Sequence, residues 1–259
     1  MWEVFRELFT YRPMIYNLVK RDIRGRYKGS LLGFTWNLIL PMMQILVYVM
    51  VFSLIFRQNL EHYYAYLVAG MVPWIMFSDS VSSGAGSVVD NSQLITKIYF
   101  PRSVIPISIV LSKFVNFAIS MVIVFVVLAF EHGFDGISLC MLPLAIVCLL
   151  LFSMGLAMLL AAANVYMRDV QYLITVILMM WIWMTPIMYS STGIDSTLVN
   201  TILAINPATY LIELFQDALY WKVLPTLTTT AIAVVESVVM LLVGAVVYEK
   251  LSQDFAEVL

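Results

Sequence analysis

Charged residues are scarce in this chain: 12% of its 259 residues are Asp, Glu, Lys or Arg, whereas 62% are hydrophobic. Soluble domains carry about 25% charged and about 45–50% apolar residues. With so little charge, the chain cannot surround a core of this size with a surface that water wets. The composition therefore excludes a cytosolic enzyme, a secreted domain and a disordered chain. It predicts a protein whose main solvent is lipid.

Cysteine and histidine are also rare, with two of each. His62 and His132 lie far apart in predicted loops, and Cys140 and Cys148 lie in or beside one apolar run, where we expect buried thiols. The sequence contains no glycine-rich nucleotide loop, no HExxH zinc motif and no GxSxG nucleophile motif. We therefore expect no cofactor and no metal on this chain. Uphill transport would need an ion gradient or another polypeptide as its energy source.

Long apolar runs dominate what is present, for example residues 119–130 and 144–160. A membrane-spanning helix needs about 20 apolar residues, whereas a barrel strand alternates polar and apolar positions. We expect an all-α integral membrane protein with six transmembrane helices in a single domain, residues 1–259. Spans one to five are expected within residues 31–189, at 31–56, 64–89, 104–130, 138–163 and 172–189. Span six is expected at residues 226–248.

Residues 1–30 hold seven of the 14 Lys and Arg residues. After Pro13, the apolar residues Ile15, Leu18 and Ile23 fall on one face at helical spacing, and the basic residues fall elsewhere. A basic amphipathic helix of this kind lies in the membrane interface. A solvated leader helix is the alternative, but the apolar span that follows at once favours the interfacial position.

Residues 198–221 are apolar but contain Asn206, Pro207, Glu213 and Asp217, so they make a poor span. We expect two short re-entrant or interfacial helices with the break at Asn206-Pro207. Non-helical backbone at membrane depth persists only where protein or a water-filled cavity covers it.

Lys and Arg are distributed unequally between the two sides of the predicted spans. Twelve fall on the side that holds both termini, and only Arg57 and Lys222 fall on the other. Because cytoplasmic loops are enriched in these residues, we expect both termini in the cytoplasm.

The residues considered so far leave two functions open, ion-coupled transport and catalysis by a membrane enzyme. An ion-coupled secondary transporter of a polar solute would use ionisable groups inside the spans, and Asp79, Lys113 and Glu236 are the candidates. These are few for an ion relay, and the role of Glu236 stays open. A membrane enzyme such as a glycan transferase would need clustered carboxylates, histidines or metal ligands at one membrane face, and the sequence offers no convincing cluster.

Six segments, in family order, resemble the membrane (permease) subunit of ABC exporters for cell-surface polysaccharides, a family that covers O-antigen, capsule and teichoic-acid exporters. The segments are KRDIRGRYKGSLLGFTW at residues 20–36 followed by Pro41, IYFPRSVIP at 98–106, NVYMRDV at 164–170, WMTPIMY at 183–189, NP at 206–207 and DFAE at 254–257.

The resemblance implies a homodimer in the bacterial inner membrane that works with two copies of a separate nucleotide-binding subunit. That partner would carry ATP and Mg, and no nucleic acid is involved. The substrate would be a polyprenyl-linked glycan; the resemblance does not separate O-antigen from capsule or teichoic acid. It also implies a cytoplasmic coupling helix at residues 91–100 and outer gate helices at 198–221. The coupling candidates are Asn91, Gln93, Lys97, Tyr99 and Arg102, and the gate candidates are Asn206, Pro207, Glu213 and Asp217.

Such a glycan needs aromatic faces for its sugar rings and positive charge for its pyrophosphate head. Most of the aromatic residues will belong to the interfacial belt or to packing. Arg24, Arg26 and Lys28 are placed to attract the head as well as anionic lipid, although positive-inside anchoring would also explain them. The candidates for the sugar channel are Trp36, Tyr48, Trp74, Phe77, Trp181 and Tyr210.

Overall fold

The computed structural model describes residues 10–26, 33–52, 60–97, 100–131, 133, 135–190 and 196–255, and within these ranges it contains helices and no strand. The elements are α2 (Arg12–Arg26), η1 (Gly33–Thr35), α3 (Trp36–Met50), α4 (Tyr63–Asp90), α5 (Ser92–Lys97), α6 (Val104–Glu131), α7 (Gly136–Leu139), α8 (Leu142–Tyr166), α9 (Val170–Trp181), η3 (Ile182–Met184), α10 (Thr197–Ile205), α11 (Pro207–Gln216), η4 (Asp217–Trp221) and α12 (Leu227–Ser252).

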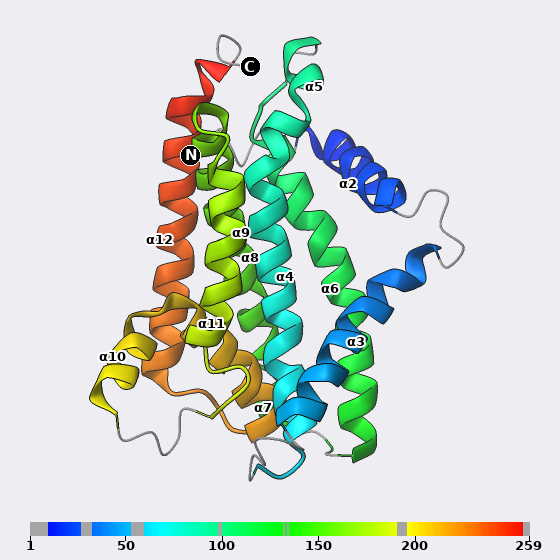
Figure 1. The fold of residues 1–259 in the computed structure, drawn as a ribbon, viewed down its shortest axis with the longest axis vertical. Coiled ribbons are helices and arrows are strands. Elements are labelled where there is room, and N and C mark those ends of the chain that lie inside the picture. Colours follow the sequence, from blue (N-terminus) through cyan, green and yellow to red (C-terminus); the bar gives the residue numbers. More distant parts are fainter. Residues whose placement is uncertain are drawn as a thin grey trace.

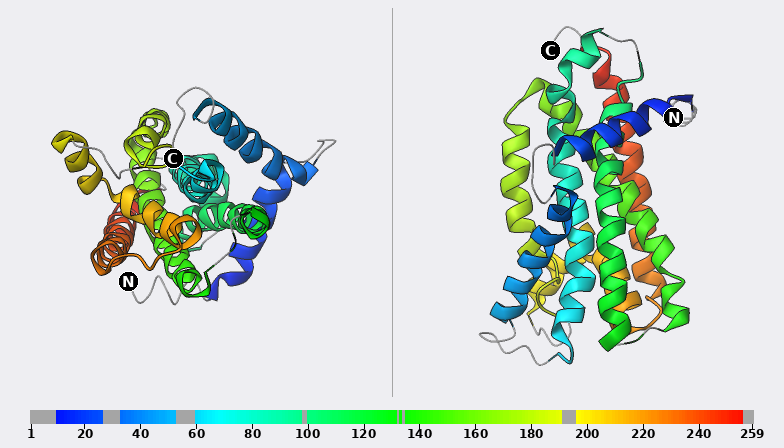
Figure 2. Two further views of the ribbon diagram at one scale, coloured as in Figure 1. Left: turned by 90° about the horizontal axis from the view of Figure 1, so that it is seen from below. Right: turned by 90° about the vertical axis from the view of Figure 1, so that its right-hand side faces the viewer.

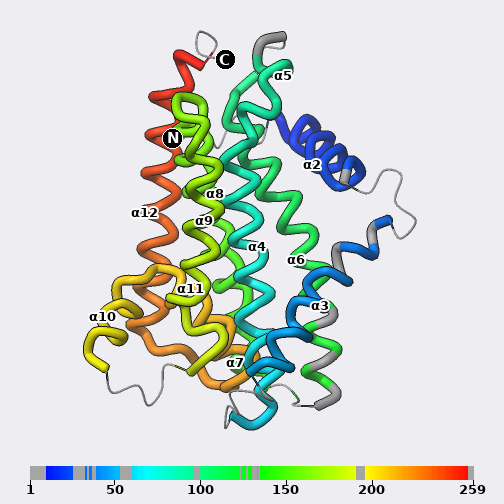
Figure 3. Tube along the Cα trace, viewed as in Figure 1, coloured from blue at the N-terminus to red at the C-terminus, as the bar shows by residue number. Residues whose placement is uncertain are grey.

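Five helices, α4, α6, α8, α9 and α12, run lengthwise through the molecule, and α3 slants alongside α4 and α6 (Figure 1). α8 packs against both α4 and α12. α5 and the C-terminal end of α12 lie at one end of the bundle, and α7, α10 and α11 lie at the other. α2 crosses α6 near the end that carries α5 (Figure 2). The long helices therefore separate one end, which holds α5, from the other, which holds α7, α10 and α11, as the trace in Figure 3 also shows.

Three described helices are long and apolar enough to cross a membrane: Val104–Val126, Gly136–Tyr166 and Leu227–Ser252. The pair Thr197–Ile205 and Pro207–Trp221 is bent by 88° at its break and would make a fourth span if it crossed as one unit. The predicted break at Asn206-Pro207 is confirmed. Because Pro207 has no N–H to donate, it favours the first turn of a new helix over the interior of the old one.

Small residues let the central helices approach one another closely. A Cβ on Gly84 of α4 would lie 2.6 Å from the Cβ of Ala157 on α8. Gly155 of α8 and Gly244 of α12 meet backbone to backbone, so that a Cβ on either would collide with main-chain atoms of the other helix. Close backbone contact through small residues is how helices gain packing energy in a lipid solvent, where apolar side chains are not driven together by water.

α4, α6, α8 and α12 lie over four of the predicted apolar segments, and their ends agree with the predicted ones to within four residues. The predicted helix over residues 172–189 was wrong in its second half. α9 ends at Trp181, and after one 3₁₀ turn Thr185 has extended backbone with φ −110° and ψ 135°. Pro186 explains the end, because proline disfavours helical backbone in the residue before it. Of the predicted first span, the structure describes α3 as far as Met50 and a further turn to Phe52.

The N-terminal amphipathic helix is present as α2, and its apolar side packs against protein. Met14, Ile15 and Leu18 pack against a buried cluster that includes Ile107 of α6. The hydroxyl of Ser112 on α6 donates to Asp22 of α2 at 2.6 Å. α2 is therefore attached to the bundle by both apolar and polar contacts.

Candidate functional site

Two cavities flank α3, and they share two polar residues. The first, which we call the α6-side cavity, lies among α3, α4 and α6 and has a volume of about 260 Å³. The second, the α9-side cavity, lies among α3, α4 and α9 and has a volume of about 440 Å³. Gln44 of α3 and Asp79 of α4 line both. The two cavities therefore meet at one amide and one carboxylate.

The α9-side cavity combines aromatic rings with hydrogen-bonding groups. Tyr48, Trp74 and Trp183 supply the rings. Hydroxyls and one carboxylate come mainly from α4, whose polar residues recur on a single helical face. The polar lining residues are Gln44, Ser78, Asp79, Ser82 and Thr175. Flat apolar faces beside amide, hydroxyl and carboxylate groups suit the alternating C–H and O–H surfaces of a sugar ring.

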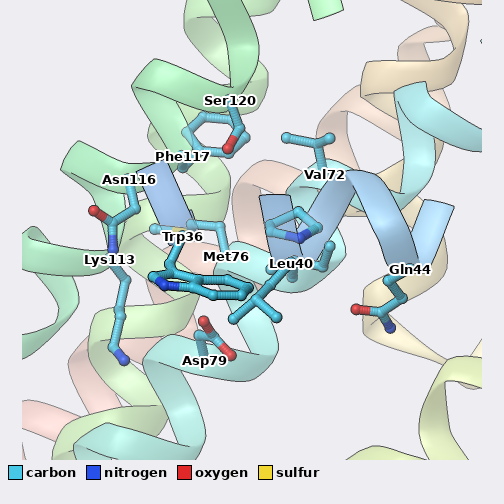
Figure 4. Close-up of a pocket in the computed structure, with 12 residues that line it drawn as sticks. Trp36, Leu40, Gln44, Val72, Met76, Asp79, Lys113, Asn116, Phe117 and Ser120 are labelled. Carbon is cyan, nitrogen blue, oxygen red and sulfur yellow. The ribbon is translucent and has the colours of Figure 1, made fainter. Parts of the chain in front are cut away.

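The α6-side cavity holds a buried cation. Lys113 of α6 is only 4% exposed, and its side chain points toward the same end of the cavity as the carboxylate of Asp79 (Figure 4). Asn116 lies one turn further along α6, and Trp36 of α3 lies between Asn116 and Asp79 in this view. Charged groups at such depth are costly and indicate function.

Behind the α9-side cavity, a cluster of aromatic rings forms part of the packed core. The ring centroids of Trp74 and Phe77 are 5.4 Å apart, and those of Phe77 and Trp181 are 5.5 Å apart in an edge-to-face arrangement. Phe77 also contacts Phe152 of α8. Such aromatic pairs stabilise a core by more than the burial of their surface alone would. Phe77 and Trp181 therefore support the cavity wall and do not line it.

Asn206 joins the break between α10 and α11 to the non-helical segment after α9. Its side-chain oxygen accepts from the Trp181 indole N–H at 2.7 Å and from the backbone N–H of Ala208 at 3.1 Å. Its amide nitrogen donates to the carbonyl of Met184 and to the hydroxyl of Thr185, each at 3.0 Å. A single buried side chain thus makes four hydrogen bonds across two irregular stretches of chain.

The rest of that segment, residues 185–190, is also held by side chains. The Tyr63 hydroxyl donates to the carbonyl of Met188 at 2.7 Å, and the Tyr66 hydroxyl shares its proton between the carbonyls of Pro186 and Tyr189, at 2.9 and 2.8 Å. Gln216 of α11 donates to the same Pro186 carbonyl at 2.9 Å. These donors satisfy carbonyls that lie outside any helix, as an apolar environment requires.

At the opposite end, Arg102 anchors the end of α12. Its guanidinium donates to the carbonyl of Ser252 and lies 6.0 Å from the ring of Phe255. In return, the Tyr248 hydroxyl donates to the Arg102 carbonyl at 2.9 Å. Tyr166 donates to the carbonyl of Leu251 at 3.0 Å. Three segments that are distant in sequence therefore meet here.

Replacing Arg102 with alanine should release the end of α12. We expect faster amide hydrogen exchange in residues 249–255, by at least about tenfold, because the change removes a charge-assisted hydrogen bond and a cation–π contact. Hydrogen-exchange mass spectrometry would measure this. Arg168→Ala is the matched control, because Arg168 is exposed. Equal exchange in the two variants would show that Arg102 does not anchor the helix.

Comparison with known proteins identifies the family. The chain matches the ABC-2 type transporter family over residues 14–220. It is 34% identical over 259 residues, 99% of both chains, to the O-antigen export system permease protein RfbA of Myxococcus xanthus. It is 29% and 27% identical to two proteins of the same name from Klebsiella pneumoniae, over 93% of each chain. This chain belongs to the ABC-2 type transporter family.

Membership of the ABC-2 family makes the chain a multi-pass membrane permease and confirms the resemblance seen in its motifs. The alternative of an ion-coupled secondary transporter is not favoured, because ABC transporters draw their energy from nucleotide hydrolysis. Glu236 lies within α12 of this permease, and one of its carboxyl oxygens is buried with no hydrogen-bond partner among the described residues.

Three of the six predicted channel residues of the ABC-2 permease line a cavity, and three do not. Trp36 lines the α6-side cavity, and Tyr48 and Trp74 line the α9-side cavity. Phe77 and Trp181 lie in the aromatic packing behind it. Tyr210 is not a lining residue; its hydroxyl donates to the carbonyl of Ala204 at 2.9 Å.

Those predicted head-binding and coupling residues that the structure describes lie near the end that carries α5. Arg24 is exposed on α2, whereas the side chain of Arg26 and all of Lys28 lie outside the described residues. The amide oxygen of Asn91 accepts from Arg21 of α2, so Asn91 ties the start of α5 to that helix. Gln93 is exposed on α5. The side chain of Lys97 and all of Tyr99 lie outside the described residues.

The predicted gate residues lie at the other end of the ABC-2 permease. Asn206 and Pro207 form the break itself. Glu213 on α11 and Asp217 at the start of η4 are both half-buried.

Gln44, which no motif marks, and the α4 hydroxyls line the cavities but were not predicted from the sequence. A signal for the latter existed: Ser78, Asp79 and Ser82 interrupt an apolar run at helical spacing.

Proposed function

We propose that this chain is the transmembrane subunit of an ATP-driven ABC exporter that moves a polyprenyl-linked, O-antigen-like polysaccharide from the cytoplasmic to the outer side of the bacterial inner membrane. The observation that carries the proposal is the 34% identity to an O-antigen export permease over 99% of both chains. Similarity over the whole length includes both ends of the bundle and the cavities between them, so it extends to every part that transport would use.

The α9-side cavity supports a carbohydrate substrate. A long glycan presents the same kind of surface at each sugar, so a channel needs contacts that tolerate many residues in succession. In proteins that bind single-stranded nucleic acid, aromatic faces provide such contacts for successive bases. They suit the C–H faces of pyranose rings equally well. Tyr48, Trp74 and Trp183 would serve as platforms, while Gln44 and Asp79 would bind hydroxyls.

The proposed assembly is a homodimer with two copies of a separate nucleotide-binding subunit, on which ATP and Mg reside. The six spans would be α3, α4, α6, α8, α9 and α12, with both termini in the cytoplasm. α5 would dock on the nucleotide-binding subunit and pass its closure to α4 and α6, between which it lies in sequence. The contacts of Asn91 with α2 and of Arg102 with α12 would extend the same movement to those helices.

At the outer side, α10 and α11 would form a gate that the glycan passes on leaving. The 88° bend between them supports a re-entrant arrangement. Glu213 and Asp217 would face the water-filled exit, and the hydrogen bonds of Asn206 would fix the position of the bend.

Replacing Tyr48 with alanine should lower glycan export, whereas Tyr48→Phe should preserve it, because phenylalanine keeps the aromatic face. Stacking on one aromatic ring contributes about 1–3 kcal/mol per base in comparable channels, so we expect roughly a tenfold loss of export for alanine. Surface polysaccharide in complemented cells is the measurement. Tyr172→Ala is the matched control, because this tyrosine of α9 is 71% exposed and lines neither cavity. Equal export by the Tyr48 and Tyr172 alanine variants would exclude Tyr48 from the channel.

Co-purification tests the assembly. The chain, tagged at its C-terminus and extracted in a mild detergent, should bring with it an ATP-binding subunit at a one-to-one ratio, in a complex sized for two of each. A homo-oligomer without any ATPase would contradict the proposed assembly and the docking role of α5.

A further inference from the structure

The α9-side cavity carries charge of one sign. Asp79 of α4 is the only charged side chain among the described residues that line it, and no lysine or arginine is among them. The rest of its polar lining, Gln44, Ser78, Ser82 and Thr175, is neutral. A polymer in this cavity would therefore meet aromatic faces, neutral hydrogen-bonding groups and one negative charge.

The charge of Asp79 is open to the cavities on both sides of α3. The residue is exposed, and the structure shows no hydrogen bond or ion pair of its carboxylate with any described residue. Lys113 lines only the α6-side cavity, where it is buried and has an interaction of its own. The α9-side cavity therefore stays negative.

The end of the bundle that holds α10 and α11 presents the same sign of charge. Along α11 and η4, every residue from Ala208 to Tyr220 is buried except Tyr210, Glu213 and Asp217. These three positions are spaced three and four residues apart, so they lie on one helical face. We call them the exit stripe. It presents one tyrosine ring and two carboxylates.

Other charged residues at this end do not reverse the balance. Among the residues that the structure describes there, Lys222 is the only lysine or arginine. Glu61 and Asp135 add two further carboxylates to those of Glu213 and Asp217. The proposed path is therefore negative at the cavity and negative again at the exit.

A polymer with a negative charge in each repeat unit would be repelled along such a path. Bringing like charges together is unfavourable, most of all where the dielectric constant is low. Pores that pass anions or phosphate are lined by arginine and lysine. The pyrophosphate of the carrier meets this repulsion once, whereas an acidic sugar meets it with every repeat unit. The path therefore discriminates by the charge of the polymer itself.

We propose that Asp79, together with the exit stripe, selects glycans built from neutral or amino sugars and rejects those with a uronic acid or a phosphate in each repeat unit. This inference rests on the proposed function and deepens it by naming the substrate class. Asp79 is the specificity-determining residue, because the neutral groups around it can bind hydroxyls of either kind of polymer. Uncharged O-antigen-like glycans fit this class, and teichoic acids, which are phosphate polymers, do not.

Export of one glycan in two charge states tests the proposal. The lipid-linked glycan that accumulates in cells without this chain is extracted and its sugar composition is determined. One half is oxidised at its primary hydroxyls to carboxylates. Each form is reconstituted into vesicles with the complex of the permease and its nucleotide-binding subunit, and ATP-dependent translocation is measured. We expect a native glycan without acidic sugars, and translocation of the oxidised form that is at least about tenfold slower, because like charges across an interface cost several kcal/mol.

Variants of Asp79 assign the selectivity to this residue. Asp79→Asn keeps the size and the hydrogen-bonding groups but removes the charge, so the ratio of oxidised to native export should rise at least about fivefold. Asp79→Glu keeps the charge and should keep the wild-type ratio. The matched control is Asp90→Asn, at an exposed position of α4 that lines neither cavity, and it should also keep that ratio. A general loss of activity in a variant lowers both rates and leaves the ratio readable.

Three results would overturn the inference and leave the proposed function standing. They are a native glycan with an acid in each repeat unit, equal export of the two forms by the wild-type complex, and a wild-type ratio in Asp79→Asn. The first two need no variant. If the wild-type complex translocated neither form with ATP, the proposed function itself would be overturned, and this inference with it.

Discussion

Gly244→Leu should prevent the chain from reaching its folded state in the membrane. A Cβ at this position collides with the carbonyl of Gly155 on α8, and the reciprocal Cβ on Gly155 collides with the carbonyl of Met240 on α12. Overpacked cores usually lose about 1–3 kcal/mol because side chains move aside. Here both obstacles are backbone atoms in long helices, so we expect a larger loss. Fluorescence-detected size-exclusion chromatography of the tagged protein would show a fall in monodisperse material to below one tenth.

The matched control is Val243→Leu, at the neighbouring position of α12, where the side chain is exposed. It should give a wild-type yield. Gly244→Ala should fall between the two, because the added atom is the smallest that meets the obstacle. A normal yield of Gly244→Leu would show that α8 and α12 do not cross at these glycines.

Asn206→Leu should have the second large effect, on both stability and export. The change removes four hydrogen bonds and leaves the Trp181 N–H and the carbonyl of Met184 without this partner. A buried polar group left unsatisfied costs about 1–3 kcal/mol, so two or more such groups should cost at least about 3 kcal/mol. Thermal unfolding in detergent and limited proteolysis within residues 185–190 would measure the loss.

Asn206→Asp separates the two halves of this network. Aspartate keeps an oxygen that accepts from Trp181 and Ala208, but it cannot donate to Met184 and Thr185. We expect an intermediate melting temperature. Asn200→Ala, on the exposed side of α10, is the control and should behave as the wild type. If Asn206→Leu melted with the control, the network would not hold the segment.

The sequence predicted the all-helical class and most long helices, because long apolar runs have few structures open to them in lipid. It also predicted the break at Asn206-Pro207. It did not predict the partners of that break. Asn206 donates to the carbonyl of Met184 and to the hydroxyl of Thr185, which lie where the chain leaves the helix before Pro186. In the sequence, Pro186 and Asn206-Pro207 are separate helix-ending signals, and only the fold brings the two segments into contact.

Only part of the candidate site could be predicted from the sequence, because the fold decides which side chains reach a cavity. Aromatic residues are common throughout the chain, and nothing in the sequence distinguishes Tyr48 and Trp74, which line a cavity, from Phe77, which is 2% exposed in the core. Arg102 carried the signal of a family motif, yet its guanidinium contacts the end of α12. Its role depends on Phe255 and Tyr248, which lie about 150 residues away in sequence.

Deleting the gene for this chain in its host cell and measuring two pools of glycan would test the export role directly. Surface polysaccharide is quantified by immunoblotting of intact cells, and lipid-linked glycan is quantified in membrane extracts. If the chain exports the glycan, surface polysaccharide should disappear while lipid-linked glycan accumulates inside, and the wild-type gene should restore both pools. Unchanged surface polysaccharide would contradict an export role. Loss of both pools would indicate a role in glycan synthesis and would exclude the export role.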